Sequence, residues 1–299
     1  MGTQGVAEAD LQSRIDAVQW PTSFEDYHES GLPPRQISFS FQTDRPSDLN
    51  ANSWTDVSGW GSYTESEKQA VRTALDIYED YINVQFVETD IENTVDFTFL
   101  RASEGVSGGR GRFQYNYSNN ALTNYDGFVL FNTNRDLSRA SDLNLILHEI
   151  GHALSLKHPG NYDVNPANAP PGPYLPADED NYKFTLMSYS VNPETSIEPA
   201  TPMLYDIAAL QDRWGANMNY MTGNDTYTAD PSGAVQVLWD AGGVDTLTAS
   251  GFSHSELNLI SGQFSSFNGQ ESVVVAYNTT IENATGTEGI DTITGNSVS

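Results

Sequence analysis

The residue pattern of the chain changes near residue 216, and this change limits what the chain can fold into. Up to that point, segments with apolar residues at helical spacing alternate with short β-rich runs. Beyond it, β-rich runs follow one another, separated by turns of Gly, Asp and Asn. The sequence therefore predicts an α+β domain over residues 1–215, with the role of residues 1–30 left open, and an all-β module over residues 216–299.

Helices and strands can be assigned from local signals. The expected helices are Thr64–Ile82 and Ser141–Leu156, each with an apolar stripe, and Pro202–Trp214. Thr64 and Glu67 form a capping box, while Thr201 and Gly215 are placed to begin and end the third helix. About five strands of a twisted sheet are expected: Ile37–Phe41, Val84–Val87, Val95–Leu100, Arg112–Tyr117 and Phe128–Asn132. Those expected in the module are Val235–Trp239, Leu257–Ile260 and Val273–Tyr277.

The charge of the chain excludes two classes of partner. Lys and Arg number 13 against 40 Asp and Glu, so the formal net charge is −27. Nucleic acids and anionic membrane surfaces both attract clustered Lys and Arg, so neither is an expected partner. No apolar run approaches the roughly 18–20 residues that span a bilayer, and Met1–Asp10 lacks a signal-peptide pattern. The carboxylates suit an extracellular, calcium-loaded protein, and they suit solubility or salt tolerance equally well.

Cysteine is absent from the chain. Disulfides, thiolate zinc sites and cysteine-based nucleophiles or latency switches are therefore excluded. The stability of the fold must come from packing or from bound metal ions.

The strongest chemical signal is an H-E-x-x-H motif in the second expected helix. Its residues are His148-Glu149-Ile150-Gly151-His152. The spacing places both imidazoles on one helix face, one turn apart, where a single zinc ion can reach both. His158 follows closely, so a chain that turns back after the helix delivers a third imidazole. Histidines at helical spacing can also be surface or capping residues.

A zinc ion held by three nitrogens keeps one coordination position for water, lowers the pKa of that water and polarises a bound carbonyl. Glu149, next to a ligand, is placed to take the proton of the water and pass it to a leaving amine. The motif therefore predicts one catalytic zinc ion and metal-assisted hydrolysis of an amide. His28 and His254 have no such neighbours and are expected to be structural.

A longer pattern resembles the signature of the metzincins, a class of zinc proteases. It reads His148-Glu149-x-x-His152-x-x-Ser155-x-x-His158. A Met-containing turn is the second hallmark of that class, and Thr185–Tyr189 is similar to its form in the serralysins, a family of secreted bacterial proteases. The resemblance implies that Met187 supports the site and that Tyr189 is an additional, displaceable zinc ligand. Ser155 stands where the signature has Gly, and a non-Gly residue at positive φ costs on the order of 1 kcal/mol or more.

The module contains a weak internal repeat, G-x-D-T-(L/I)-T, in residues 241–248 and 285–294. It is similar to the repeat of the calcium-binding β-rolls that follow the catalytic domain of serralysins. The resemblance implies one or more structural Ca²⁺ ions in a β-roll or sandwich that is truncated or reduced after one degenerate rung. The positions that carry over are Gly223, Asp225, Asp240, Gly242, Gly243 and Asp245, then Gly286, Glu288 and Asp291. These residues could instead be ordinary turn positions.

Substrate contacts are the hardest feature to predict from this sequence. Metzincins hold their substrate as an extra strand on a sheet edge, and Gly111–Tyr117 is the candidate edge. The candidate contact residues are Gly111, Arg112, Phe113, Gln114 and Tyr115. The aromatic residues among them could equally be half-buried sheet packing.

The sequence and the resemblance together predict a secreted, extracellular zinc endopeptidase, monomeric and acting on proteins and peptides. The alternative is a calcium-dependent binding or structural module in which Ser155 has impaired the zinc site. Retention of Glu149 argues against that alternative, since an inert zinc site has no use for a base.

Overall fold

The computed structural model describes residues 8–21, 33–91, 95–118, 121–162 and 170–298, so His28 and part of segment 1–30 lie outside the described residues. The chain forms two compact units, each built from separate stretches. The sheet unit comprises residues 19–157 and 213–216, and the β-rich unit comprises residues 1–18, 158–212 and 217–299. The functional division at residue 216 stays a prediction.

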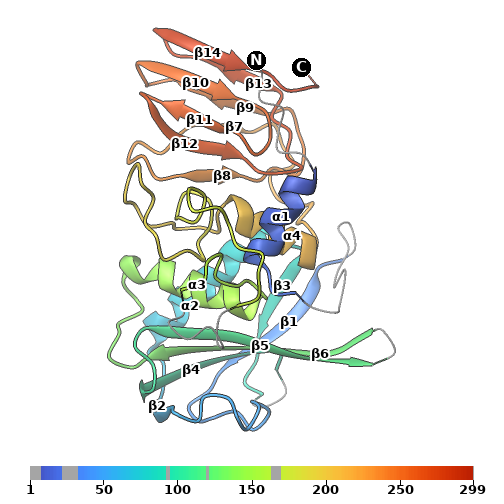
Figure 1. Ribbon diagram of the computed structural model, residues 1–299, viewed down its shortest axis with the longest axis vertical. Helices are drawn as coiled ribbons and strands as arrows, with labels where there is room; N and C mark the ends of the chain where they lie inside the picture. Colours follow the sequence, from blue (N-terminus) through green and yellow to red (C-terminus); the bar gives the residue numbers. More distant parts are fainter. Residues whose placement is uncertain (1–7, 22–32, 92–94, 119–120, 163–169, 299) are drawn as a thin grey trace. The chain divides into compact units, whose positions relative to one another are not determined.

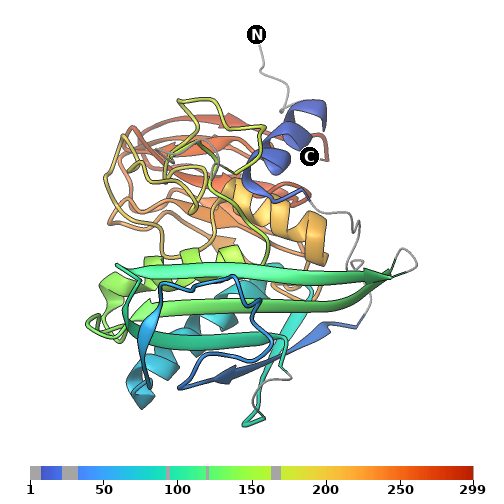
Figure 2. The same ribbon diagram turned by 60° about the horizontal axis from the view of Figure 1, so that its bottom comes forward.

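The sheet unit contains a six-stranded sheet with two helices over one face (Figures 1 and 2). The strand order is β3-β1-β4-β6-β5, and β2 pairs with β4. Strands β3, β1, β4 and β6 run parallel, whereas β5 runs antiparallel to β6 and forms one edge. The strands are β1 (Arg35–Phe41), β2 (Ser58–Gly61), β3 (Val84–Glu88), β4 (Phe97–Glu104), β5 (Gly109–Ser118) and β6 (Ala121–Asn132).

Helices α2 (Glu65–Tyr81) and α3 (Leu143–Ala153) pack on each other, and α3 lies against β5 and β6. A short 3₁₀ turn, η1 (Ala140–Asp142), leads into α3. The predicted capping box is present, because the Thr64 side chain accepts from the Glu67 N–H and the Glu67 carboxylate accepts from the Thr64 N–H. This start places Val71, Ala74 and Leu75 in the core, where none is more than 1% exposed. Strands β4 and β6 supply Phe97, Phe99 and Phe131 to one face of the sheet and Phe128 to the other, and all four are fully buried.

The β-rich unit contains two sheets, α1 (Glu8–Val18) and most of α4 (Leu204–Trp214). The five-stranded sheet has the order β14-β10-β11-β12-β8, and the three-stranded sheet has the parallel order β13-β9-β7. Leu247, Val273 and Ile281, all fully buried, belong to the core of this unit. The strands are β7 (Thr226–Tyr227), β8 (Gln236–Leu238), β9 (Thr246–Thr248), β10 (His254–Asn258), β11 (Phe264–Phe267), β12 (Gln270–Val275), β13 (Asn283–Thr285) and β14 (Ile290–Thr294).

The α+β class and the three predicted helices are confirmed, and three differences are informative. α4 begins after Met203 rather than at Pro202, because the Asp206 carboxylate accepts the Met203 N–H while Ile207 N–H donates to the Met203 carbonyl. The sheet has a sixth strand, β2, which is short and half glycine and so carries little strand signal. α1 was not predicted, because its apolar residues form only a weak stripe.

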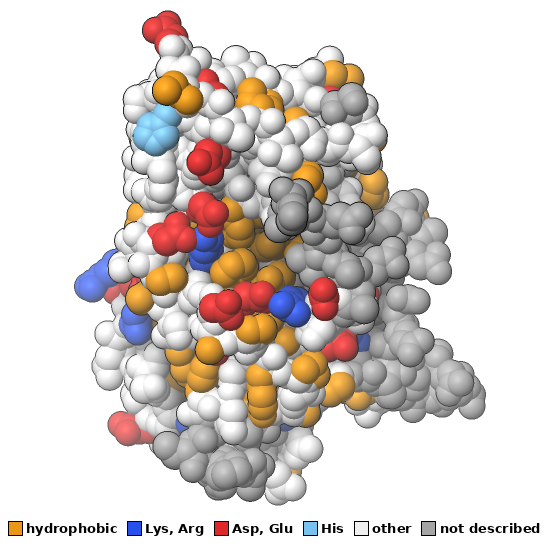
Figure 3. Space-filling model, turned by 45° about the horizontal axis from the view of Figure 1, so that its top comes forward, with side chains coloured by type: hydrophobic (Ala, Val, Ile, Leu, Met, Phe, Trp, Pro, Cys, Tyr) orange, Lys and Arg blue, Asp and Glu red, His pale blue; other side chains and the backbone are white. Residues whose placement is uncertain are grey.

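No helix among the described residues is long and apolar enough to cross a membrane. The acidic side chains on the face drawn in Figure 3 lie in several separate groups rather than in one continuous patch. The net charge of −27 is therefore not gathered into a single field on that face.

Candidate metal centre and active site

Helix α3 carries the first two predicted zinc ligands and the predicted base. Its apolar side includes Ile146, Leu147 and Ile150 and is fully buried. The packing of this side fixes the orientation of the helix and so the direction in which the motif residues face. The rings of His148 and His152 lie with their centroids 4.8 Å apart and almost perpendicular, at 88°. The two rings are therefore neighbours one helical turn apart, as the four-residue spacing predicted.

The carbonyl groups of α3 are held by three aromatic side chains. The Tyr78 hydroxyl donates to the Leu147 carbonyl at 2.6 Å. The Tyr125 hydroxyl donates to the Ala153 carbonyl at 2.7 Å, and the Trp214 indole N–H donates to the Leu154 carbonyl at 3.0 Å. The last two bonds satisfy carbonyls that the helix end leaves without a helical partner. The helix is thereby fixed from three other segments of the sheet unit.

The chain reverses immediately after α3 in a Schellman turn. The Leu156 N–H donates to the Gly151 carbonyl at 2.9 Å, and the Ser155 N–H donates to the His152 carbonyl at 3.2 Å. Ser155 occupies the left-handed position of this turn with φ +80° and is fully buried. The departure from the metzincin signature therefore keeps the turn and adds backbone strain to it.

The turn also fixes the chemical form of His152. Its Nδ1 lies 2.9 Å from the Leu156 carbonyl oxygen, which can only accept a hydrogen bond. Nδ1 of the neutral ring therefore carries the proton, and Nε2 carries the lone pair that a metal requires. The ligand atoms of His148, His152 and His158 all lie within 4.8 Å of one another, so these three imidazoles could hold a metal ion.

We expect Ser155→Gly to raise the free energy of unfolding by about 1 kcal/mol. The change removes the strain of positive φ, and it removes a buried hydroxyl that has no hydrogen bond of normal geometry and only a weak interaction with Tyr125. The greater flexibility of glycine in the unfolded chain offsets part of the gain. Urea unfolding of the zinc-free protein measures the effect.

The matched control is Ser155→Ala, which removes the hydroxyl and keeps the strained φ. The Gly variant should therefore be more stable than the Ala variant. The reverse order would show that backbone strain at this position is negligible.

Glu149 is held by strand β5. It is 6% exposed, and its carboxylate accepts the Gly111 N–H. A Cβ atom at Gly109 would collide with the Glu149 side chain, and one at Gly111 would collide with the backbone of Glu149. Both glycines are therefore needed for β5 to lie this close to α3.

Burial raises the pKa of Glu149 to about 8, while the Gly111 N–H and the positive charge of Arg110 act to lower it. A cation bound by the neighbouring histidines would act in the same direction as Arg110. The position of Glu149 is thus set by the edge strand, while burial raises its pKa and nearby positive charge lowers it.

The residues predicted to contact substrate all lie on β5, the edge strand next to α3. Arg112 donates to the Ser53 hydroxyl, and Gln114 donates to the Asp48 carbonyl and to Asp126. Phe113 stacks between Tyr115 and Tyr125, with ring centroids 6.1 and 5.4 Å away. These side chains make contacts within their own unit and stay half-buried, so their contact with substrate stays a prediction.

The predicted Met turn lies in the β-rich unit. Met187 is fully buried, and its N–H donates to the Thr185 hydroxyl at 3.0 Å. Tyr189, the predicted fourth ligand, is 62% exposed, and its ring lies 4.5 Å from the ring of His158. Asp206 of α4 accepts from the Thr185 hydroxyl and from the Leu186 N–H, both at 2.6 Å. These two bonds hold the Met turn against the first turn of α4.

Three of the predicted calcium residues form a second group that could hold a metal ion: Asp225, Asp240 and Asp245. Asp245 is fully buried, and its Oδ2 has no hydrogen-bond partner among the described residues. Burial and the charges of Asp240, Glu282 and Asp225 raise the pKa of Asp245. A buried, unsatisfied carboxylate oxygen among other carboxylates fits a hard cation such as Ca²⁺.

The predicted glycines shape this group. Gly242 and Gly243 have φ of 151° and 152°, conformations that side chains disfavour. A Cβ atom at Gly243 would collide with the Gly223 carbonyl oxygen, so the two turns can approach only with glycine there. Asp225 N–H donates to Asp245 Oδ1 at 2.7 Å and ties the two turns together.

The other three predicted calcium positions are not gathered in the same way. The Asp291 carboxylate accepts from the Ser255 hydroxyl and from the N–H and hydroxyl of Thr287. Gly286 lies against Asp291, where a Cβ atom would collide with the carboxylate. Hydroxyl and amide donors thus use part of the hydrogen-bonding capacity of Asp291, and no described contact joins Glu288 to this arrangement.

Sequence reasoning missed two groups beside these sites. Glu282 accepts the Asp245 N–H at 2.8 Å, and Tyr227 donates to the Asp240 carboxylate at 2.5 Å. Sequence analysis also gave no role to Asp206. An acidic residue in the first turn of α4 was the only local signal for it, because its partners in the Met turn are about twenty residues away.

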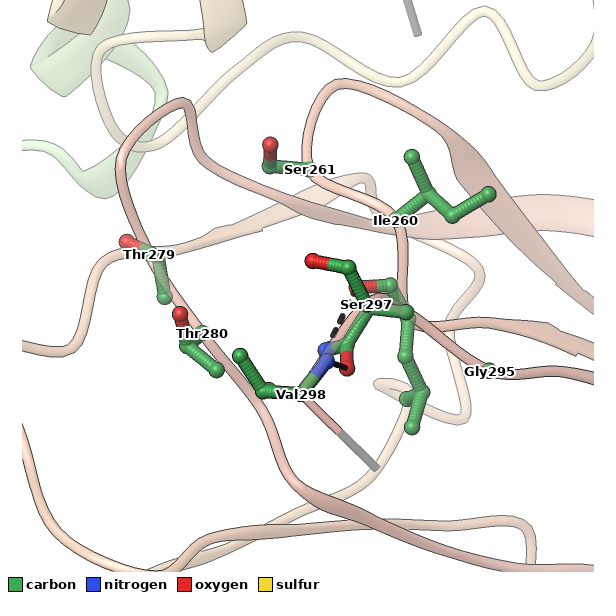
Figure 4. A pocket seen from close by; sticks show the side chains of 9 residues that line it. Ile260, Ser261, Thr279, Thr280, Gly295, Ser297 and Val298 are labelled. Atoms are coloured by element: carbon green, nitrogen blue, oxygen red, sulfur yellow. Dashed lines mark hydrogen bonds between the residues drawn. The ribbon is translucent and has the colours of Figure 1, made fainter. Parts of the chain in front are cut away.

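One cavity of about 330 Å³ lies in the β-rich unit and contains none of the predicted site residues (Figure 4). Residues of the chain end line one side, and the Val298 N–H donates to the Asn296 side chain there. The Ser297 hydroxyl points into the space between the labelled residues. Its lining is mainly aliphatic and hydroxyl side chains without a charged group, so it offers no chemistry for the predicted reaction.

Comparison with known proteins agrees with the site. Residues 211–298 match the family model described as Peptidase M10 serralysin C terminal. The serralysin of Proteus mirabilis is 34% identical over 273 residues, covering 78% of this chain and 55% of that protein. Serralysin G of Dickeya chrysanthemi is 33% identical over 289 residues, covering 87% of this chain and 59% of that protein.

The chain therefore spans a little over half the length of these relatives. Among solved structures, the hatching enzyme high choriolytic enzyme 1 of Oryzias latipes covers 71% of this chain and 96% of its own at 13% identity. Its TM-score of 0.36 is too low to bear on the fold. The sequence similarity and the signature from His148 to His158 identify the chain as a serralysin-like metzincin.

Proposed function

We propose that this chain is the catalytic part of a secreted zinc endopeptidase that hydrolyses peptide bonds of proteins. The observation that carries the proposal is the group of three imidazoles, His148, His152 and His158, with Glu149 beside them. Three nitrogen donors that leave one position for water are the ligand set of a catalytic zinc site. The similarity to serralysins over most of the chain supports the same function.

The residues present fit one zinc ion, because Nε2 of His152 is fixed as the lone-pair nitrogen by the bond at Nδ1. Zinc held there would lower the pKa of a bound water and polarise the carbonyl of the scissile peptide bond. Glu149 would take the proton of that water and deliver it to the leaving nitrogen. Tyr189 is proposed as an additional, displaceable ligand, and Met187 as support for the site.

Strand β5 is proposed as the binding edge for an extended substrate. It ends the order of its sheet, and its Gly111 N–H holds the Glu149 carboxylate. A peptide that adds to this edge through backbone hydrogen bonds would be placed in register with the base. Recognition through the backbone would let one site cut many protein sequences.

The conformation of Ser155 gives no physical reason to expect an impaired zinc site. That alternative rested on Ser155, and Ser155 adopts the left-handed conformation that the turn needs. The Schellman bonds and the Leu156 bond to His152 are both made with serine in place.

Metal content by mass spectrometry, together with casein hydrolysis before and after o-phenanthroline, tests the proposal. About one zinc ion per chain and hydrolysis that the chelator abolishes and zinc restores are expected. Calcium without zinc, with no hydrolysis after zinc is supplied, would contradict the proposed activity.

We further infer a structural Ca²⁺ site at Asp225, Asp240 and Asp245, with Gly223, Gly242 and Gly243 shaping its turns. The unsatisfied Asp245 Oδ2 supports it. Parallel pairing of β7, β9 and β13 after such turns fits the first rungs of a β-roll, with residues 216–299 as the calcium-binding module. Gly286, Glu288 and Asp291 are proposed as an incomplete second site, and the protein as a monomer.

Calcium removal is expected to destabilise the protein by about 3 kcal/mol relative to a solution with calcium at a hundred times its Kd. The physical reason is that binding relieves repulsion among the three carboxylates and satisfies Asp245. Thermal unfolding with excess EGTA and with excess calcium measures the difference.

Asp245→Asn serves as the control for this experiment, since it removes one ligand charge and keeps the shape. Its stability should respond to calcium much less than that of the unchanged protein. An equal response in both proteins would place the calcium elsewhere.

A further inference from the structure

The rings of His158, Tyr162 and Tyr189 lie close together. The ring of Tyr189 lies 4.7 Å from the ring of Tyr162 at an interplanar angle of 23°, a stacked pair. The ring of His158 lies 4.5 Å from Tyr189 and 5.6 Å from Tyr162. Tyr189 is 62% exposed, and its stacked contact with Tyr162 restrains the rotamer of its ring.

Tyr162 is itself fixed through its hydroxyl. That hydroxyl donates to Asp180 Oδ1, lies 3.3 Å from the Ser188 hydroxyl and accepts the backbone N–H of Tyr189. Ser188 donates to the same Asp180 oxygen at 2.6 Å. The Tyr162 hydroxyl thus links Asp180 to the backbone of Tyr189, while the Tyr162 ring stacks on the Tyr189 ring.

The segment between His158 and Tyr162 makes room for this packing. A Cβ atom at Gly160 would come within 2.5 Å of the Tyr162 ring and 2.6 Å of the Asp180 carboxylate. Gly160 and Pro159 are both buried, and the Pro159 carbonyl accepts the Leu175 N–H at 2.9 Å. The turn after the third histidine is therefore shaped around Tyr162 and Asp180.

We propose that Tyr162 is a positioning residue, which holds the ring of Tyr189 beside His158 in the orientation that the reaction uses. Its ring supplies the stacking surface, and its hydroxyl anchors the Tyr189 backbone. Tyr162 acts only through Tyr189 and has no contact with substrate in this proposal. The inference rests on the proposed peptidase function, in which Tyr189 is a displaceable ligand.

The stacking step can be measured without zinc or activity. In metal-free protein carrying ¹³C-labelled tyrosine, the Tyr189 ring signals are identified by their loss in Tyr189→Phe. The ring currents of Tyr162 and His158 both displace these signals, so Tyr162→Phe should leave them in place and Tyr162→Leu should remove the part that Tyr162 causes. Tyr189 signals that keep the same positions in Tyr162→Leu overturn the proposal, whether or not the protein proves to be a peptidase.

The functional step is tested by a double-mutant cycle on the zinc-loaded enzyme. Tyr162→Leu is expected to lower kcat roughly threefold to tenfold, the range covered by loss of one aromatic pair, with KM nearly unchanged and Tyr162→Phe restoring most of the rate. In the Tyr189→Phe background the same substitution should have no further effect. Losses that add in the double variant would show a general structural role and overturn the proposal.

Tyr174→Leu is the matched control, because it makes the same chemical change in the same long connection at a side chain that is 40% exposed. It should leave kcat unchanged. If the unchanged protein shows no zinc-dependent hydrolysis, the proposed function fails, and the ring signals alone then decide whether Tyr162 positions Tyr189.

Discussion

Glu149→Gln is expected to lower kcat for peptide hydrolysis roughly 10²–10⁴-fold while zinc stays bound. Glutamine keeps the shape of the side chain and an oxygen that can accept the Gly111 N–H, so β5 and α3 should stay in place. It cannot take the proton of a water molecule, which is the step assigned to Glu149. Initial rates on a quenched fluorescent peptide give kcat, and mass spectrometry of the same sample gives the zinc content.

A suitable control is Glu88→Gln at the end of β3, where the carboxylate pairs with Arg72 on the protein surface. Its kcat should equal that of the unchanged enzyme, because a surface ion pair contributes little and lies outside the proposed mechanism. A loss below threefold in Glu149→Gln would mean that another group takes the proton. Loss of zinc from that variant would assign Glu149 to metal retention instead.

The parts of the fold that could be predicted are those whose signals are local. The capping box at Thr64 and the apolar stripe of α3 each lie within one helix, and both are present. The spacing of His148 and His152 predicted a zinc site because four residues make about one helical turn. A turn after α3 was expected from the third histidine, and Ser155 lies in it at positive φ.

The parts that could not be predicted depend on contacts between distant segments. Nothing in the residues around Gly109 and Gly111 indicates that α3 will lie against them, yet a Cβ at either position would meet Glu149. Glu282 reaches the Asp245 turn only because β13 pairs with β9. Short strands such as β7 and β13 have two or three residues, too few for a period-two pattern.

Asp206→Ala is expected to lower the free energy of unfolding by about 3–5 kcal/mol. Asp206 is fully buried, and it accepts from the Thr185 hydroxyl, the Leu186 N–H and the Met203 N–H at 2.6–2.9 Å. Alanine would leave these three buried donors without an acceptor and would release the Met turn from the start of α4. Urea unfolding measures the loss, and kcat of the folded fraction reports whether the turn still supports the site.

The pH dependence of stability separates the charge of Asp206 from its hydrogen bonds. Burial raises the pKa of Asp206 from 3.8 to about 6, so the folded protein binds this proton more tightly than the unfolded chain does. The stability that Asp206 contributes is therefore greatest below pH 3.8 and falls, by about 3 kcal/mol in all, as the pH rises through 6.

Asp206→Asn has no such titration, because its side chain carries no ionisable proton. It should be less stable than the unchanged protein in acid, where a protonated Asp206 keeps all its hydrogen bonds without a buried charge. The gap between the two proteins should then narrow as the pH rises from about 4 to about 7, since only the unchanged protein acquires a buried charge. Urea unfolding of both proteins at several pH values gives this gap directly. A gap that stays constant would mean that the carboxyl titrates alike in the folded and unfolded chain, and that the three hydrogen bonds fully offset its burial.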